Sequence, residues 1–336
     1  MSQTSRHILI TGGAGFIGSH LAEQLLLRGD HVTVVDDLST GDLANVEQAK
    51  SMFPGRVEFV HSTVSAAFQL AQWPRFAEIY HLAAAVGVRL IVQKPSQSIE
   101  TNVLETSAAI RWAIRDDAKL LVASSSEVYG KGVRVPFAES DDVVFGPTTS
   151  SRWSYGYSKA LDEFLTFAAV KESGLKAVII RFFNTVGPRQ KGEWGMVLPR
   201  FIQAALVGDA LEVHGDGSQL RCFCDVRDVA PALIQLLADQ KSCGRVFNIG
   251  SDQMISIQSL AQRVIGVTGS SSRIVNVTHE QIFGKGFEDL QVRQPNLERV
   301  RGAIGFMPHV ALDTTIADIA LLLGKARKPC KGERAA

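Results

Sequence analysis

Short apolar runs alternate with amphipathic stretches along the first half of the chain. The apolar runs are rich in β-branched residues and predict strands at residues 7–10, 31–35, 57–60, 78–82, 119–123 and 177–182. Between them the apolar positions recur with a helical period, for instance over residues 18–28, 99–115 and 157–172. This order predicts an α/β fold in which helices cover both faces of a doubly wound parallel sheet.

The pattern changes after Asn184. Loops rich in Gly and Pro separate shorter elements there, which predicts a smaller C-terminal lobe of mixed α/β structure. We therefore expect a first domain at residues 1–183, a second lobe at 184–325 and a flexible tail at 326–336. The segment near residues 225–250 again carries helix and strand patterns, and we expect it to return to the first domain.

Composition and charge exclude several classes of protein. A formal net charge of +1 over 336 residues provides no global field for binding nucleic acid or a membrane surface. No apolar run approaches the roughly 20 residues of a membrane-spanning helix, and the short polar start leads directly into the first predicted strand, so we expect a cytoplasmic protein. The cysteines lack a second ligand pair at zinc-like spacing, so no metal site is predicted. They are Cys222, Cys224, Cys243 and Cys330.

A glycine-rich turn follows the first predicted strand. Gly12, Gly15 and Gly18 recur every third residue where the apolar run gives way to a helical pattern. Such a turn offers backbone N–H groups and the positive end of a helix to a pyrophosphate, as in the Rossmann fold. The second predicted strand ends in Asp36, whose carboxylate suits the ribose hydroxyls of adenosine and repels a 2′-phosphate. The sequence therefore predicts a site for NAD rather than NADP.

Further cofactor contacts are predicted around this turn and at the ends of the neighbouring strands. Small side chains after residue 82 suit the close approach of a cofactor. The additional positions are Phe16, Ile17, Asp37, Thr63, Val64, Leu82, Ala83 and Ala84.

A tyrosine and a lysine four residues apart form the second motif. Tyr155 and Lys159 are separated by one helical turn, so both side chains project from one face. We expect the Lys159 ammonium and the positive nicotinamide ring to lower the pKa of Tyr155 and to make its phenol a base. Tyr157 is the alternative base. This pair and the cofactor site predict an enzyme that transfers hydride at a carbinol carbon.

Hydroxyl and acidic side chains follow the predicted strand at residues 119–123. They lie at the carboxyl edge of the sheet, where ligands bind in such folds. A hydroxyl there can share the substrate proton with Tyr155, and we assign this role to Ser125. Ser126 and Glu127 complete the predicted catalytic set.

Together these motifs resemble the extended short-chain dehydrogenase/reductases that act on nucleotide sugars. The resemblance covers nearly the whole chain and includes two further stretches, at residues 181–189 and 214–221. It implies a tightly held NAD in the first domain, with Lys159 on the nicotinamide ribose and with Ser125 and Tyr155 at the substrate hydroxyl. It also implies a UDP-sugar substrate in the second lobe and a homodimer whose helices at residues 99–115 and 157–172 form a four-helix bundle. The implied substrate contacts are Arg89, Asn184, Val197, Arg221 and Arg293.

The reaction is suggested by the residues after Ser125. The pair Ser126 and Glu127 is similar to the Ser-Glu pair of UDP-glucuronate decarboxylases, and the stretch at residues 287–296 is similar to their Arg-x-Pro-Asp segment. Our prediction is therefore decarboxylation of UDP-glucuronate to UDP-xylose or its 4-keto precursor. Gly87-Val88-Arg89 looks more like a UDP-sugar 4-epimerase, and Thr63 stands where the family usually has an Asp for adenine. A 4-epimerase, a 4,6-dehydratase and a nucleotide-binding sensor are the alternatives.

Overall fold

A seven-stranded parallel sheet forms the centre of the first domain in the computed structural model, which describes residues 5–70, 73–85, 94–192, 196–283 and 290–326. The strand order is β11-β6-β5-β4-β1-β2-β3. The bounds are β1 (His7–Thr11), β2 (His31–Asp36), β3 (Val57–His61), β4 (Glu78–His81), β5 (Lys119–Ser125), β6 (Ala177–Phe182) and β11 (Arg245–Ile249). The predicted doubly wound parallel sheet is therefore confirmed.

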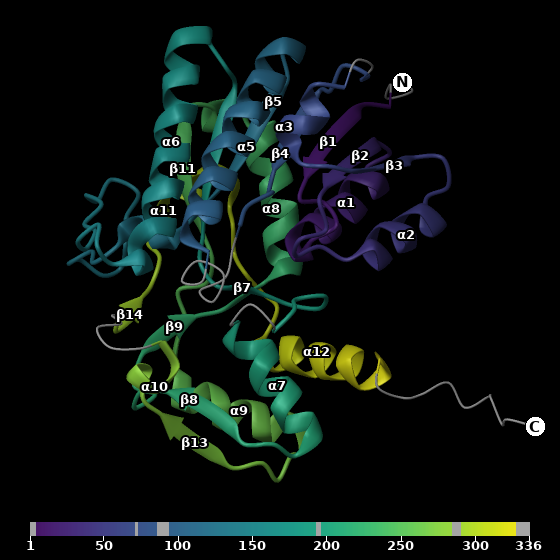
Figure 1. Cartoon of the computed structure of the whole chain (residues 1–336). Helices are drawn as coiled ribbons and strands as arrows, with labels where there is room; N and C mark the ends of the chain where they lie inside the picture. The colour runs from purple at the N-terminus through teal and green to yellow at the C-terminus, as the bar shows by residue number, and fades with distance from the viewer. Residues whose placement is uncertain (1–4, 71–72, 86–93, 193–195, 284–289, 327–336) are drawn as a thin grey trace, which may run out of the picture.

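Helices cover both faces of this sheet (Figure 1). One face carries α1 (Phe16–Leu27), α2 (Leu43–Met52), α8 (Val226–Ala238) and α11 (Glu298–Ile304), and the other carries α3 (Val64–Phe68), α5 (Pro95–Asp116) and α6 (Ser154–Ser173). Each face buries its own apolar core, because the strands are apolar on both sides. Both α8 and β11 come from the second half of the chain and pack into this domain.

The second lobe lies beneath the carboxyl ends of these strands in the view of Figure 1. Its helices are α7 (Val197–Val207), α9 (Ile257–Thr268), α10 (His279–Phe283) and α12 (Leu312–Ala326). Its strand pairs are β8 (Leu211–His214) with β13 (Ile274–Val277), β7 (Thr185–Val186) with β10 (Cys224–Asp225), and β9 (Leu220–Cys222) with both β12 (Met254–Ser256) and β14 (Val292–Arg293). A separate apolar core around Phe201, Leu260 and Ile316 holds it together. In the described ranges no helix is both long and apolar enough to cross a membrane.

The strand order fixes where a ligand can bind. The chain runs outward from β1 through β2 to β3, and then returns to the other side of β1 as β4. In open α/β sheets, ligands bind at the carboxyl ends of the strands where the order reverses in this way. Here that position lies between β1 and β4, at the strand end from which the glycine turn continues into α1.

Candidate active site

The glycine turn brings backbone segments closer together than side chains would allow. Gly12 has a φ of +72°, and a Cβ there would lie 2.7 Å from the backbone nitrogen of Ala83. A Cβ on Gly18 would lie 2.2 Å from the carbonyl oxygen of Gly12. The residue before α1 is Gly15, which has no side chain to cap the helix. The turn thus leaves the first N–H groups of α1 for an anion and fits a dinucleotide pyrophosphate.

Asp36 anchors this turn at the end of β2. Its carboxylate accepts hydrogen bonds from the backbone nitrogens of Ala14 (3.0 Å) and Leu38 (2.8 Å). Burial raises the pKa of Asp36, and these two hydrogen bonds oppose the increase. A carboxylate accepts about four hydrogen bonds. Asp36 can therefore still accept hydrogen bonds from the ribose hydroxyls that the sequence assigned to it.

The other predicted cofactor residues lie at neighbouring strand ends. Phe16 and Ile17 open α1, and the exposed Asp37 accepts a hydrogen bond from the backbone nitrogen of Ser39. Thr63 accepts a hydrogen bond from Ala66 at the start of α3, and its neighbour Val64 is buried. The segment Leu82, Ala83 and Ala84 follows β4 and is half-buried.

The segment after β4 is tied to the glycine turn and to α5. The Leu82 backbone nitrogen donates to the Thr11 carbonyl oxygen at 3.0 Å. His81 is fully buried between the hydroxyls of Thr11 (2.8 Å) and Thr106 (3.0 Å). Burial and the charge of Lys159 lower the pKa of His81 to about 3, so it is neutral and structural. Asn102 on α5 accepts from the Ala85 nitrogen (2.9 Å) and donates to a serine of α6 (3.0 Å).

Tyr155 and Lys159 lie on α6 and are both buried. The Tyr155 phenol is hydrogen-bonded to Ser125, whereas the Lys159 ammonium donates to the carboxylate of Asp162 at 2.9 Å. Burial raises the pKa of Tyr155, the charges of Glu127 and Asp162 raise it further, and the Ser125 bond opposes them. The polypeptide alone thus does not lower this pKa as the sequence led us to expect, because the Lys159 charge is compensated by Asp162. Asp162 was not predicted from the sequence, although its place one turn after Lys159 was a visible signal.

Glu127 lies in a 3-10 turn directly after β5, between two arginines. Its carboxylate accepts from Arg152 Nη1 at 2.6 Å and from Arg293 Nη1 at 2.8 Å. Burial favours a raised pKa for Glu127, but the charges and hydrogen bonds of Arg293 and Arg152 lower it to about 2. The neighbouring Ser126 is buried. Glu127 is therefore a fixed carboxylate and not a proton donor.

Two of the residues that assemble this site were missed from the sequence. Arg152 belongs to the 3-10 turn at Ser151–Trp153, directly before α6, so it reaches the site together with Tyr155. Gly156 lets α6 approach the turn of Glu127, because a Cβ on Gly156 would lie 2.6 Å from the Glu127 carbonyl oxygen. A basic residue shortly before the tyrosine and a glycine directly after it were the available signals.

The predicted substrate residues lie on different elements of the second lobe or outside the described residues. Arg221 on β9 pairs in register with Arg293 on β14, so the structure brings these two largely buried arginines together. Asn184 has a φ of +27° and donates to the carbonyl oxygen of Cys222 at 2.9 Å. Val197 is the first residue of α7, and Arg89 lies outside the described residues.

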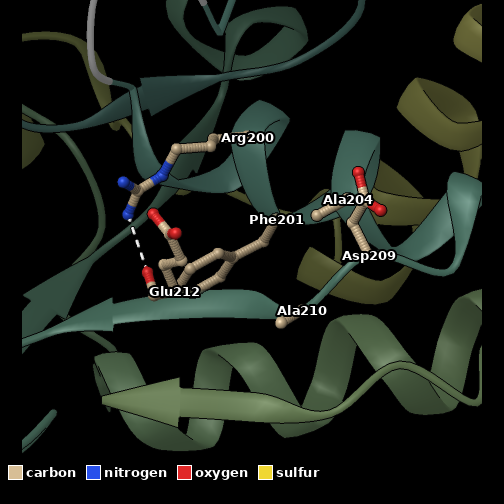
Figure 2. Close-up of a pocket in the computed structure, with 6 residues that line it drawn as sticks. All are labelled: Arg200, Phe201, Ala204, Asp209, Ala210 and Glu212. Carbon is tan, nitrogen blue, oxygen red and sulfur yellow. Dashed lines mark hydrogen bonds between the residues drawn. The ribbon is translucent and has the colours of Figure 1, made fainter. Parts of the chain in front are cut away.

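A separate hollow of about 360 Å³ lies on the second lobe between α7 and β8 (Figure 2). Arg200 and Phe201 project from α7, and Arg200 Nη2 donates to the carbonyl oxygen of Glu212 at 2.9 Å. The remaining lining residues are Ala204, Asp209 and Ala210. None of these residues belongs to the predicted site, so this hollow does not mark the catalytic centre. The described residues also contain no cluster of three side chains suited to a metal ion.

A dinucleotide cradle, a buried tyrosine bonded to a serine, and a lysine on the same helix define an NAD-dependent enzyme of the dehydrogenase type. Residues 8–250 match the model of the NAD dependent epimerase/dehydratase family, and the chain belongs to this family. Its cofactor is accordingly NAD, whose site the glycine turn and Asp36 fit.

Similar proteins come from bacteria and animals. A UDP-N-acetyl-alpha-D-glucosaminuronate decarboxylase of Bacillus cytotoxicus is 41% identical over 91% of this chain and 94% of its own length. UDP-glucuronic acid decarboxylase 1 of Xenopus tropicalis is 33% identical over 92% of this chain and 70% of its own length. Among solved structures, the UDP-glucose 4-epimerase of Thermotoga maritima superimposes with a TM-score of 0.83 at 28% identity, covering 96% of this chain and all (100%) of the epimerase.

Proposed function

We propose that this protein is an NAD-dependent decarboxylase of a UDP-hexuronate, with UDP-glucuronate as the substrate inferred from the sequence. The observation that carries this proposal is the ionised Glu127 beside Tyr155 and Ser125. A carboxylate with a pKa of about 2 cannot protonate a departing hydroxyl, which argues against a 4,6-dehydratase. Relatives at 41% and 33% identity carry decarboxylase names, one for the acetamido sugar and one for glucuronic acid.

The mechanism that we propose begins at the C4 hydroxyl of the sugar. Tyr155, through its hydrogen bond with Ser125, takes the hydroxyl proton as C4 is oxidised to a ketone. NAD, when bound, supplies the hydride acceptor and a positive charge that favours the phenolate. The ketone makes the sugar a β-keto acid, so the electron pair of the C5–carboxyl bond can move toward the C4 oxygen as CO2 leaves. A water molecule or a neighbouring acid then protonates C5, which gives the 4-keto pentose. Return of the hydride to C4, and of the proton from Tyr155 to the C4 oxygen, gives UDP-xylose.

A UDP-sugar 4-epimerase is the second candidate function. The fold similarity to the Thermotoga maritima 4-epimerase favours it, since that protein matches nearly the whole chain. An epimerase shares the oxidation step at Tyr155 but returns hydride to the other face of the ketone. Such an enzyme does not need an additional carboxylate held between two arginines, which is why we favour the decarboxylase.

Product masses separate the candidate reactions. We expect the purified protein with NAD to convert UDP-glucuronate or UDP-N-acetylglucosaminuronate into a product lighter by the mass of CO2. Mass spectrometry of the nucleotide sugars, with UDP-glucose and dTDP-glucose as parallel substrates, checks this. Isomers of unchanged mass would identify an epimerase, and loss of water from dTDP-glucose would identify a dehydratase. A protein that forms no product and no transient NADH with any of these sugars would contradict an enzymatic role.

The helices α5 and α6 support a homodimer, which we propose is built through a four-helix bundle. They pack side by side on one face of the sheet (Figure 1). Tyr157, Leu161 and Phe164 recur along one stripe of α6 and are 41%, 45% and 68% exposed. Leu104 on α5 is 58% exposed. Apolar side chains that recur with helical spacing on an exposed face favour pairing with a second copy.

Light scattering in solution tests this dimer. We expect the unmodified protein to have twice the chain mass and the Leu161→Glu, Phe164→Glu variant to have the single-chain mass, because buried charges oppose association. Leu321→Glu is the control, since Leu321 is 58% exposed on α12, away from this face. A monomeric unmodified protein, or a double variant that stays dimeric, would contradict the proposal.

The state of the cysteines supports a cytoplasmic location, which we also propose. Cys222, Cys224 and Cys243 are free, and Cys330 lies outside the described residues. Burial raises the pKa of Cys222 to about 12, so this thiol is unreactive. Free, inert thiols are typical of proteins in a reducing compartment. Fractionation of cells with an antibody against the protein would test the location.

A further inference from the structure

The Lys159 ammonium is held by one anion in the interior of the first domain. It donates to Asp162 Oδ2 at 2.9 Å, and the side chains of Lys159 and Asp162 are only 1% and 0% exposed. Within the described ranges the ammonium forms no other ion pair. Burial raises the pKa of Asp162 and the charge of Lys159 opposes this increase, so the carboxylate depends on its cation. An ammonium carries three N–H donors, so two remain for a ligand beside Tyr155.

A chain of buried hydrogen bonds extends from this ion pair to the backbone beside the glycine turn. Asp162 is hydrogen-bonded to the hydroxyl of Thr106 on α5. Thr106 Oγ1 lies 3.0 Å from His81 Nε2, and His81 Nδ1 lies 2.8 Å from Thr11 Oγ1. The backbone nitrogen of Ala83 donates to the same Thr11 oxygen at 3.4 Å. Asp162, Thr106, His81 and Thr11 are all fully buried, so bulk water does not replace a bond that is lost.

The carboxylate fixes the direction of every bond in this chain. An ionised carboxylate only accepts hydrogen bonds, so the Thr106 hydroxyl donates to Asp162 and its oxygen accepts from His81 Nε2. His81 is neutral, and a neutral imidazole has one donor and one acceptor nitrogen, so Nδ1 accepts from the Thr11 hydroxyl. The Thr11 oxygen then accepts from the Ala83 nitrogen. The two ends of the chain, a carboxylate and a backbone N–H group, therefore require the same direction.

We propose that Asp162 is a positioning residue whose carboxylate holds the Lys159 ammonium in one place, one helical turn from Tyr155, and fixes His81 as the Nε2–H tautomer. This proposal rests on the function proposed above, in which Tyr155 takes the proton of the C4 hydroxyl. A lysine that is already ordered by Asp162 loses little conformational freedom when a ligand binds. The chain also joins the helix of Tyr155 to α5, β4 and β1, so the base and the glycine turn keep a fixed relation.

The tautomer of His81 tests the direction of the chain without any turnover. Nitrogen NMR of the whole chain, labelled in its histidines, distinguishes a protonated Nε2 from a protonated Nδ1, and His81→Gln identifies the signal. We expect the Nε2–H tautomer in the unmodified protein. In Asp162→Asn the amide oxygen faces Lys159, which only donates, so the amide NH2 turns to Thr106 and the Nδ1–H tautomer of His81 gains population. A protonated Nδ1 in the unmodified protein, or an unchanged tautomer in Asp162→Asn, overturns the proposal.

The rate of NADH formation tests the position of Lys159. Asp162→Asn is expected to lower this rate about 10²-fold, because misplacing a positioned group by about 1 Å has an effect of that size. The KM for the UDP-sugar should stay unchanged, since the predicted substrate contacts lie on other elements. Asp116→Asn is the matched control. Asp116 is also a buried aspartate, but it accepts from the Phe76 nitrogen near the amino end of β4, whereas His81 ends that strand. An unaltered rate in Asp162→Asn overturns the proposal.

A pair of threonine variants keeps the proposal falsifiable even if Asp162→Asn fails to fold. Thr106→Val removes the hydroxyl between Asp162 and His81 at almost constant shape, so the Nε2–H group loses its acceptor and the Nδ1–H tautomer should gain population. Thr166→Val is its control, because Thr166 is equally buried but donates only to the Asp162 carbonyl oxygen, at 2.8 Å. Identical tautomers in Thr106→Val and the unmodified protein overturn the proposal. If the unmodified protein forms no NADH with any UDP-hexuronate, the proposed function fails, whereas the tautomer still decides the role of Asp162.

Discussion

Replacing Tyr155 with Phe is expected to abolish nearly all oxidation of the sugar. The phenol is buried, bonded to Ser125, and is the proposed acceptor of the C4 proton. Proton transfer by a positioned group contributes about 10²- to 10⁴-fold to a rate, so we expect a loss of that size. The absorbance of NADH formed after mixing enzyme, NAD and UDP-glucuronate measures this step directly. Binding of NAD should change little, because the glycine turn and Asp36 lie on other elements.

Tyr157→Phe provides the matched control for this experiment. Tyr157 is 41% exposed, its ring stacks on Phe145 at 4.0 Å, and its hydroxyl donates to the Gly146 carbonyl oxygen at 3.4 Å. It therefore lies away from Ser125 and should retain full oxidation when its hydroxyl is removed. If NADH formation survives in Tyr155→Phe and disappears in Tyr157→Phe, the roles of the two tyrosines are reversed.

The sheet could be predicted from the sequence because its strands are continuous apolar runs. Each predicted strand of the first half lies within one residue or two of β1 to β6, since parallel strands buried on both faces leave a simple signal. Helix starts were less accurate. The helix α5 begins at Pro95 and α6 at Ser154, earlier than expected, because their first turns carry few apolar residues. Proline at the first helical position was the overlooked start signal.

The site could be predicted only where its residues are close together in the sequence. Tyr155, Lys159 and the serines after β5 form local motifs, so their chemistry was visible. The partners of Glu127 were not, because Arg152 and Arg293 come from a turn and from a strand of the second lobe. The part that Lys159 plays at Tyr155 was not visible for a related reason, since the Lys159 ammonium also donates to Asp162. Electrostatic balance in a buried site depends on contacts that spacing alone does not reveal.

The ionisation of Glu127 sets the pH range over which its pairs with Arg152 and Arg293 are intact. Its pKa in the folded chain is about 2, below the ordinary value of 4.5. A carboxylate with a lowered pKa stabilises the fold above its unfolded pKa, and this contribution is lost as the pH falls through the folded pKa. Glu127 should therefore stay ionised and paired with both arginines at every pH above about 4. If the reaction rate changes with pH near neutrality, the titration of a group other than Glu127 must cause that change.

Replacing Glu127 with Gln is expected to slow the release of CO2 by about 10²-fold or more, the size of effect seen when a preorganised charge is removed from an active site. The substitution removes a negative charge beside Tyr155, Arg152 and Arg293, so we expect the sugar carboxylate to be bound more tightly in the ground state than in the transition state, where its charge moves toward the C4 oxygen. Release of labelled CO2 from carboxyl-labelled UDP-glucuronate measures this step, and the transient NADH measures the oxidation before it. Oxidation and NAD binding should be affected far less.

The matched control for this prediction is Glu78→Gln. Glu78 is also a buried glutamate between two arginines, Arg6 at 2.8 Å and Arg28 at 2.7 Å, but it lies at the amino end of β4, across the sheet from the site. Both substitutions remove a buried carboxylate that pairs with two arginines, so both should lower the melting temperature. Only Glu127→Gln should slow the release of CO2 much more than the oxidation that precedes it. Equal rates of CO2 release in Glu127→Gln and the unmodified enzyme would show that the carboxylate has no part in this step, and a similar slowing in Glu78→Gln would assign the effect to lost stability.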